Sequence, residues 1–296
     1  MSLAVLAPAK VNLALHVTGQ RADGYHLLDS LVSFAPFGDR LEIAPAEEIS
    51  LTVAGPEAAG VPADARNLVW KALAATGLGA ARMRLVKHLP AASGIGGGSS
   101  DATAAIRGAL ALAGLSGQLA AGRLRAGALD LDLAALGADL PMCFAPHPAR
   151  ATGIGEHLAP VTLPPLPALL VNPRVEVPTP TVFKALTRKD NPPIDPIPAF
   201  ADTRACIAWL ATQRNDLEPP AIAAAPVIAD VLAALEALPG ARLARMSGSG
   251  ATCFALFETL AEAKAAEARL AAAHPAWWSA SGTLGNQEEA ARPQPL

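Results

Sequence analysis

Four glycines within five positions constrain this chain more than any other feature of its sequence. They are Gly94, Gly96, Gly97 and Gly98. Residues 83–89 before them read as a strand, and residues 99–113 after them have helical spacing. Consecutive glycines let backbone N–H groups converge on one anion, and the start of a helix adds unpaired N–H groups and the positive end of its dipole. Ser99 and Ser100 add hydroxyl groups suited to phosphate or Mg²⁺. The sequence therefore predicts a phosphate-binding loop.

Two common nucleotide-binding motifs differ from this segment. A Walker loop has Lys after its last glycine, whereas here Ser99 follows Gly98. A Rossmann fingerprint fits poorly, because the spacing is G-x-G-x-x-S and no acidic residue follows in the expected context about 20 residues later. A flexible turn before a helix capped by Ser99 or Ser100 stays open as the structural alternative.

The composition favours a globular protein that acts on a small solute. The chain has 296 residues, of which 52% are hydrophobic and 17% charged, and this length predicts two lobes. Its formal net charge is −3 and basic residues form only isolated pairs, so we expect no nucleic-acid partner. The three cysteines are widely spaced, which predicts reduced thiols rather than disulfides or a zinc site.

Neither an export signal nor a membrane span is expected. Residues 3–6 are apolar but lack a basic flank, and Pro8 and Lys10 follow them closely. The long apolar stretch 222–238 is interrupted by a proline and two acidic residues. We therefore expect a cytoplasmic protein with no membrane partner.

The chain reads as a mixture of strands and helices in two lobes. Alternation predicts a half-buried strand over 10–17, with Lys10 and Asn12 side by side on its polar face. The other predicted strands are 27–34, 40–43, 83–89, 168–172 and 253–257, and the predicted helices are 65–76, 99–113, 130–136, 178–186, 203–211, 226–238 and 260–273. Proline-rich residues 160–167 predict a lobe boundary. The expected domains are 1–159 and 160–285, followed by a disordered tail over 286–296.

Several motifs together resemble the GHMP kinases. The segment from Pro90 to Ser100, followed by Asp101-Ala102, is similar to the P-x-x-x-G-L-G-G-G-S-S loop of that family. Pro8-Ala9-Lys10-Val11-Asn12-Leu13 and Arg21-Ala22-Asp23-Gly24-Tyr25-His26 are similar to the opening signature of one member, and five later motifs follow in the same order up to about Phe257. Ala91-Ala92-Ser93, Ile95 and Ser249 depart mildly from the pattern and bear on the shape of the loops.

The resemblance implies an α+β, two-lobed GHMP kinase fold. Its N-terminal β-α lobe would carry the glycine-rich ATP loop and its C-terminal lobe would be ferredoxin-like. The implied reaction is transfer of a phosphoryl group from ATP, with Mg²⁺, to a hydroxyl of a small cytidine-diphosphate-linked substrate in isoprenoid biosynthesis. The implied ATP-binding residues are Pro90, Ala91, Ala92, Ser93, Gly94, Ile95, Gly96, Gly97, Gly98, Ser99 and Ser100.

The resemblance also assigns the catalytic pair. Asp139 would accept the proton of the hydroxyl, and Lys10 would pair with it and hold it ionised. From the residues alone, Asp139 is as typical of a helix N-cap before Leu140, and Lys10 is typical of a solvated surface lysine.

Four further residues are implied to bind the acceptor. Tyr25 would stack on the cytosine ring, Phe183 would cover its other face, His26 would hydrogen-bond to its edge, and Asn12 would line the site beside Lys10. Ordinary core packing stays open for Tyr25 and Phe183, and a loop histidine with satisfied hydrogen bonds stays open for His26. The run from Ser247 to Gly250 predicts either a second backbone cradle or a hairpin turn, and Asp101 would favour the helix dipole with or without a metal contact.

Overall fold

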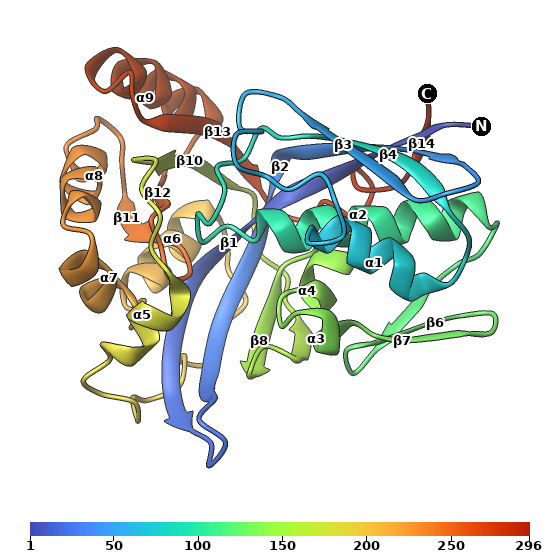
Figure 1. Cartoon of the computed structure of the whole chain (residues 1–296). Helices are drawn as coiled ribbons and strands as arrows, with labels where there is room; N and C mark the ends of the chain where they lie inside the picture. Colours follow the sequence, from blue (N-terminus) through green and yellow to red (C-terminus); the bar gives the residue numbers. More distant parts are fainter.

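The computed structural model describes residues 1–296 as two lobes joined by a pair of long strands (Figure 1). The strands are β1 (Leu3–Gln20) and β2 (His26–Pro45), which pair antiparallel along nearly their whole length. Register shifts at Pro8/Lys10, Asn12/Ala14 and Val17/Gly19 interrupt the ladder. Such bulges increase local twist and re-aim side chains, so one strand pair can contribute to both lobes.

The N-terminal lobe is a mixed sheet covered by helices. Its sheet runs in the order β14-β1-β2-β4-β3, with β8 pairing to β2 and β9 to β8. The strands are β3 (Ser50–Ala54), β4 (Ala81–Val86), β8 (Ala149–Gly153), β9 (His157–Pro160) and β14 (Gln294–Pro295). The helices are α1 (Leu68–Thr76), α2 (Gly97–Leu112), α3 (Leu133–Leu136) and α4 (Leu140–Phe144). A separate small sheet contains β5 (Gln118–Ala120), β6 (Arg123–Ala126) and β7 (Leu129–Asp132).

The C-terminal lobe is a four-stranded antiparallel sheet of order β11-β12-β10-β13. The strands are β10 (Leu166–Asn172), β11 (Leu243–Met246), β12 (Cys253–Leu256) and β13 (Trp278–Leu284). The helices are α5 (Thr179–Lys184), α6 (Thr203–Ala211), α7 (Glu218–Ala224), α8 (Val227–Glu236) and α9 (Leu260–Ala273). This architecture confirms the predicted two-lobed α+β fold. None of the helices combines the length and the apolar character that crossing a membrane requires.

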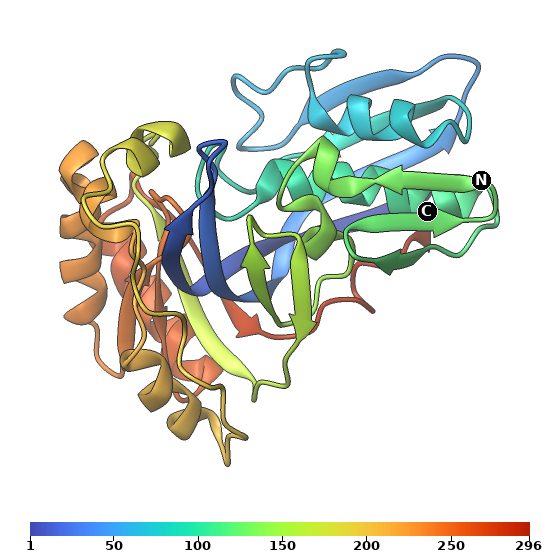
Figure 2. The ribbon, with the colours of Figure 1, turned by 90° about the horizontal axis from the view of Figure 1, so that it is seen from below.

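Strand β1 is buried on both faces because it lies between the lobes (Figure 2). Val11 and Leu13 pack against Leu170 and Phe254 of the C-terminal sheet. The opposite face of that sheet, including Leu169, packs against α8 and α9. The prediction of a half-buried strand is therefore wrong, since alternation could not reveal that the second lobe covers it.

Four further predicted segments differ from the structure. Strands 27–34 and 40–43 are one continuous strand, β2, because Gly38 and Asp39 resume the pairing with β1 after a register shift. The predicted helix 130–136 starts later than expected, because β7 extends to Asp132, which then caps the single-turn α3. A disordered tail is predicted over 286–296, but these residues make contacts in the structure. Strand β14 pairs with β1, and Ala291 is fully buried. The domain boundary near 160 stays a prediction.

Candidate functional site

The glycine segment forms a tight loop that leads directly into α2. Gly94 and Gly96 have φ values of +75° and +66°, in a region that favours glycine. Gly96 is the N-cap and α2 begins at Gly97, so the alternative of a helix capped by Ser99 or Ser100 is wrong. The Ser100 hydroxyl is buried and donates to the Pro8 carbonyl at 2.7 Å. It is thus engaged within the protein, whereas Ser99 is half-buried.

The loop is fixed on one side by β1 and on the other by the C-terminal lobe. The backbone N–H of Lys10 donates to the carbonyl of Ile95 at 2.9 Å. The Ser247 hydroxyl accepts the backbone N–H of Asn12 at 3.0 Å and lies 3.2 Å from the Gly94 carbonyl oxygen, to which it donates. A Cβ on Gly94 would lie 2.6 Å from the Ser247 carbonyl oxygen, so no larger residue fits there. Residues 247–250 also connect the paired strands β11 and β12, as a hairpin turn would.

Lys10 and Asp139 form an ion pair beneath the loop. The Lys10 Nζ lies 2.9 Å from Asp139 Oδ2, and the two side chains are 6% and 37% exposed. Asp139 occupies the N-cap position of α4 but makes no capping hydrogen bond with its side chain. A Cβ on Gly96 would lie only 3.4 Å from Lys10 Cε. The structure therefore brings the predicted pair together next to the start of α2, and the solvated-lysine alternative is wrong.

A buried charge cluster that no sequence pattern indicates lies on the other side of the α2 N-terminus. Lys87 donates to carboxylates of Asp39 and, at 2.7 Å, of Asp101, and all three side chains are almost fully buried. Asp39 also accepts the backbone N–H groups of His88 and Leu89. Asp101 lies beyond the first turn of α2, so the predicted dipole contact is replaced by this cluster. In the sequence, only the position of Lys87 near the end of the strand that leads into the glycine loop indicates that this lysine belongs to the site.

The charged groups in this cluster shift one another's pKa values. Burial and the neighbouring Asp39 raise the pKa of Asp101 well above its usual range, against the opposing effect of Lys87. Burial by itself would lower the pKa of Lys87, but the two carboxylates outweigh it and raise that pKa. Lys87 is therefore a permanent cation close to Gly97, where a Cβ would lie 3.6 Å from Nζ.

The predicted acceptor residues come from both lobes. His26, at the start of β2, and Phe183, in α5, stack on each other with ring centroids 4.9 Å apart and an interplanar angle of 26°. Tyr25 is 61% exposed at the tip of the β1–β2 hairpin, so its core-packing alternative is wrong. Burial, followed by the charge of Lys189, lowers the pKa of His26. A neutral imidazole can donate from one ring nitrogen and accept at the other.

Asn12 lies between the pair of Lys10 and Asp139 and the C-terminal lobe. Its Nδ2 donates to the Ser30 hydroxyl at 2.8 Å, and its buried Oδ1 has no hydrogen-bond partner in the protein. A Cβ on Gly248 would lie 3.3 Å from this oxygen. Because unsatisfied buried acceptors are costly, Oδ1 is available to a donor group of a ligand.

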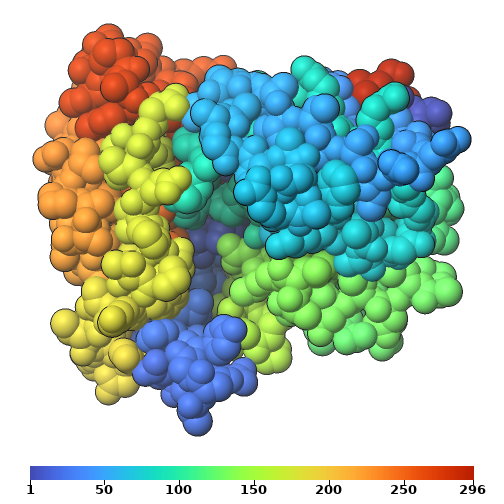
Figure 3. Space-filling view, in the orientation of Figure 1, coloured from blue at the N-terminus to red at the C-terminus, as the bar shows by residue number.

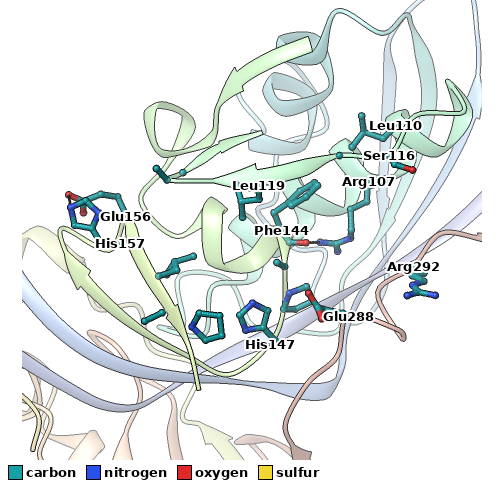
Figure 4. A pocket seen from close by; sticks show the side chains of 18 of the residues that line it. Arg107, Leu110, Ser116, Leu119, Phe144, His147, Glu156, His157, Glu288 and Arg292 are labelled. Carbon is teal, nitrogen blue, oxygen red and sulfur yellow. Dashed lines mark hydrogen bonds and ion pairs between the residues drawn. The ribbon is translucent and has the colours of Figure 1, made fainter. Parts of the chain in front are cut away.

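A hollow separates the two lobes above these residues. Figure 3 shows it between the yellow and orange C-terminal segments and the cyan and green N-terminal ones, with dark blue residues at its floor and the β1–β2 hairpin at its lower end. A cavity of about 1010 Å³ lies elsewhere, between the end of α2, the hairpin of β8 and β9, and the chain terminus (Figure 4). None of the predicted site residues lines it.

The residues present suit a magnesium ion held mainly by phosphate groups. No group of three His, Cys, Asp or Glu side chains could hold a metal ion by itself. Asp39 and the Oδ2 of Asp101 pair with Lys87, and the Oδ1 of Asp101 is buried without a hydrogen-bond partner, so the Ser99 hydroxyl and the partly exposed Asp139 are the more accessible oxygens near the loop. Magnesium in phosphoryl-transfer sites keeps few protein ligands and is bound largely by the substrate's phosphates, which matches this donor set.

The three cysteines are expected to be unreactive in the folded protein. Burial raises the pKa of Cys143 and of Cys206 to about 12, with Asp139 adding to the effect at Cys143, and burial raises that of Cys253 as well. Because the thiolate is the nucleophile, iodoacetamide at pH 8 should alkylate no cysteine in native protein and all three after denaturation, as measured by mass spectrometry. Rapid alkylation of the native protein would contradict these environments.

The same shifts predict how stability changes with pH. Unfolded thiols ionise near pH 9, whereas the buried ones stay neutral to higher pH. The unfolded state therefore loses protons first, and the free energy of unfolding should fall as the pH rises from about 9 toward 12.

Family comparisons match both lobes. The model for the N-terminal domain of GHMP kinases matches residues 67–145, and that for the C-terminal domain of GHMP kinases matches residues 199–276. A 4-diphosphocytidyl-2-C-methyl-D-erythritol kinase of Dinoroseobacter shibae is 58% identical over 284 residues, which cover 95% of each chain. One of Ruegeria pomeroyi is 52% identical over 291 residues, covering 96% of this chain and 100% of the relative.

Solved structures give the same result. A crystal structure of 4-(cytidine 5'-diphospho)-2C-methyl-D-erythritol kinase has a TM-score of 0.75 and 35% identity, covering 96% of this chain and 99% of that one. A homoserine kinase from Cytophaga hutchinsonii has a TM-score of 0.62 and 20% identity, covering 99% and 96%. The second match shows the fold alone, whereas the first is similar in sequence as well as in fold.

Proposed function

Since the chain belongs to the 4-diphosphocytidyl-2-C-methyl-D-erythritol kinases of the GHMP kinase family, we propose that it phosphorylates the 2-hydroxyl of that compound with ATP in the non-mevalonate isoprenoid pathway. The observation that carries the proposal is the ion pair of Lys10 and Asp139 directly beneath the N-cap of α2. It puts a carboxylate and a cation next to the N-terminus of a helix, where phosphate groups bind.

The glycine loop is proposed to bind the phosphates of ATP. The first N–H groups of α2, preceded by the loop from Pro90 to Gly96, are unpaired within the helix and suit phosphate oxygens. A bound magnesium ion would neutralise charge on the phosphates, and the half-buried Ser99 in the first turn of α2 would help to hold it through its hydroxyl. Lys87 adds a fixed positive charge on the side of Gly97.

Asp139 is proposed to accept the proton of the acceptor hydroxyl as the oxygen attacks the terminal phosphate. The Lys10 ammonium holds this carboxylate ionised and fixes its direction, because it donates a charge-assisted hydrogen bond to Oδ2. The exposed fraction of Asp139 faces solvent and is available to a substrate. Positioning and charge compensation are the main demands of phosphoryl transfer, and both are supported by this geometry.

The cytidine group is proposed to bind at the lower end of the hollow. Tyr25 is exposed enough to close over a nucleobase, and Phe183 offers an aromatic face on the other lobe. Phe183 stacks on His26 here, so the imidazole must turn out of this stack for a base to take its place on Phe183 and for His26 to meet the edge of that base. A neutral His26 can meet both a donor and an acceptor of cytosine.

The proposal predicts a clear preference among acceptors. With ATP and Mg²⁺, kcat/KM for 4-diphosphocytidyl-2-C-methyl-D-erythritol should exceed the values for homoserine, mevalonate and galactose by at least about 10⁴-fold, since a site built for polar groups rejects analogues that lack them. A coupled assay of ADP release measures all four. Equal or better use of another acceptor would identify a GHMP kinase of different specificity.

A further inference from the structure

An ion pair bridges the two lobes on the far side of the glycine loop from Lys10. Arg174, between β10 and α5, donates from Nη1 to Glu57 Oε2 at 2.7 Å, and its Nη2 lies 2.7 Å from Glu57 Oε1. Such a two-point contact fixes both distance and direction. The side chain of Glu57 is only 9% exposed and that of Arg174 is 47% exposed. Residues 57 and 174 lie 117 positions apart in the chain, so the ion pair joins two segments that are distant in the sequence.

The backbone at Arg174 is held in a costly conformation to make this contact. Its φ of +60° lies in the left-handed region, which a residue with a long side chain rarely adopts. The Asn172 side chain stabilises the turn, because its Oδ1 accepts the Arg174 N–H at 2.7 Å. Local strain of this kind persists where surrounding contacts fix it, and it gathers at functional sites.

Both ends of the pair are attached to the flanks of the glycine loop. On the N-terminal side, the Glu57 N–H donates to the Lys87 carbonyl at 3.2 Å, and a Cβ on Gly55 would lie 2.4 Å from that same oxygen. On the C-terminal side, Asn172 Nδ2 donates to the Thr252 hydroxyl at 2.8 Å, and the Thr252 N–H donates to the Ser93 carbonyl at 3.1 Å. The loop therefore lies within a closed ring of contacts that includes the ion pair.

The position of the transferred phosphate indicates where the rest of ATP lies relative to this ring of contacts. The α2 N-terminus lies between Lys10, on the side of Gly96, and Lys87, on the side of Gly97. The transferred phosphate must lie near Asp139 and Lys10, so the rest of the ATP molecule extends away from them. The turn at residues 55–58 is hydrogen-bonded to the Lys87 backbone and lies beside the space into which the nucleoside part of ATP extends.

We propose that Glu57 and Arg174 form a latch between the lobes that holds the 55–58 turn against the nucleoside side of the glycine loop. Both are positioning residues for ATP rather than catalytic residues, and the inference rests on the proposed function of that loop. When the ion pair is intact, the 55–58 turn stays at a fixed distance from the glycine loop and from the bound nucleoside. When the pair is broken, the turn can move away from them.

The test compares two substitutions of Arg174 with a matched control. Arg174→Met removes the charge and keeps the side-chain bulk, and Arg174→Gly removes the charge while relieving the strain of the φ of +60°. Arg204→Met breaks another bidentate arginine–carboxylate pair, with Glu258, which lies wholly within the C-terminal lobe. Calorimetry measures the Kd of a non-hydrolysable ATP analogue with Mg²⁺, kinetics measures KM and kcat, and thermal unfolding measures Tm.

Both Arg174 variants should raise the Kd of the analogue and the KM for ATP about fivefold, the loss expected for a half-exposed ion pair, with kcat and the acceptor KM within about twofold. Arg174→Gly should do so with a Tm equal to or above that of wild type, whereas Arg204→Met should leave the Kd unchanged. An unchanged Kd in both Arg174 variants, or an equal rise in Arg204→Met, would overturn the latch. Wild-type protein that binds the analogue without phosphorylating the acceptor contradicts the proposed function instead, and the calorimetric comparison still decides the latch.

Discussion

Asp139→Asn should lower kcat by about 10²- to 10⁴-fold, the usual contribution of a positioned general base, while ATP binding stays near wild type. Asparagine keeps the shape of the side chain, but its amide cannot accept the proton of the attacking hydroxyl. The Lys10 ammonium would lose its only charged partner, so its position should also be less well defined. Rapid-quench measurement of the chemical step, with calorimetry of ATP binding, separates these effects.

Asp132→Asn is the matched control for that variant. Asp132 lies seven positions earlier and caps α3, where its Oδ1 accepts the N–H of Ala135. Asparagine is as good an N-cap as aspartate, so stability and kcat should both stay close to wild type. Full activity of Asp139→Asn would remove Asp139 from the mechanism, and equal losses in the two variants would point to a general effect on folding.

Gly96→Ala should reduce kcat/KM for ATP by about 100-fold, because small displacements of phosphate-binding groups are costly in a preorganised site. The added Cβ would lie 3.2 Å from Lys10 Cβ and 3.4 Å from Lys10 Cε, so the N-cap of α2 or the lysine must move. The φ of +66° adds strain of about 1 to 2 kcal/mol for a residue with a side chain. Steady-state kinetics and thermal unfolding measure the two consequences.

Gly77→Ala separates strain from displacement. Gly77 ends α1 with a φ of +61°, and nothing lies within 4 Å of the position its Cβ would take. It should therefore lose about as much stability as Gly96→Ala from backbone strain, with no loss of activity. If both variants kept wild-type kcat/KM, the loop would not position ATP through Gly96.

Local sequence patterns predicted the loop and the elements next to it, because strand, glycines and helix follow one another without interruption. Helices 203–211 and 260–273 were predicted with the bounds that α6 and α9 have, since their spacing and caps are local features. The patterns do not reveal the continuity of β2, whose ladder with β1 resumes after an irregularity, or the strand at 129–132, which forms a hairpin with β6, because strand pairing overrides local preference there.

The site itself could be predicted only through the family resemblance. Lys10 and Asp139 lie 129 positions apart, so nothing in their spacing indicates that they meet. The cluster of Lys87 with Asp39 and Asp101 was missed for the same reason, since burial of three charges together is a property of the folded chain. The stacking of Phe183 on His26 likewise depends on how α5 packs against the hairpin.

Phosphorus NMR of the reaction products tests the central claim most directly. With ATP, Mg²⁺ and 4-diphosphocytidyl-2-C-methyl-D-erythritol, wild-type protein should produce one new phosphate-monoester signal in step with ADP, while the two diphosphate signals of the acceptor persist. Under the same conditions Asp139→Asn should produce almost none. ADP formed with inorganic phosphate and no phosphorylated acceptor, or equal product from the variant, would contradict phosphoryl transfer at the site of Lys10 and Asp139.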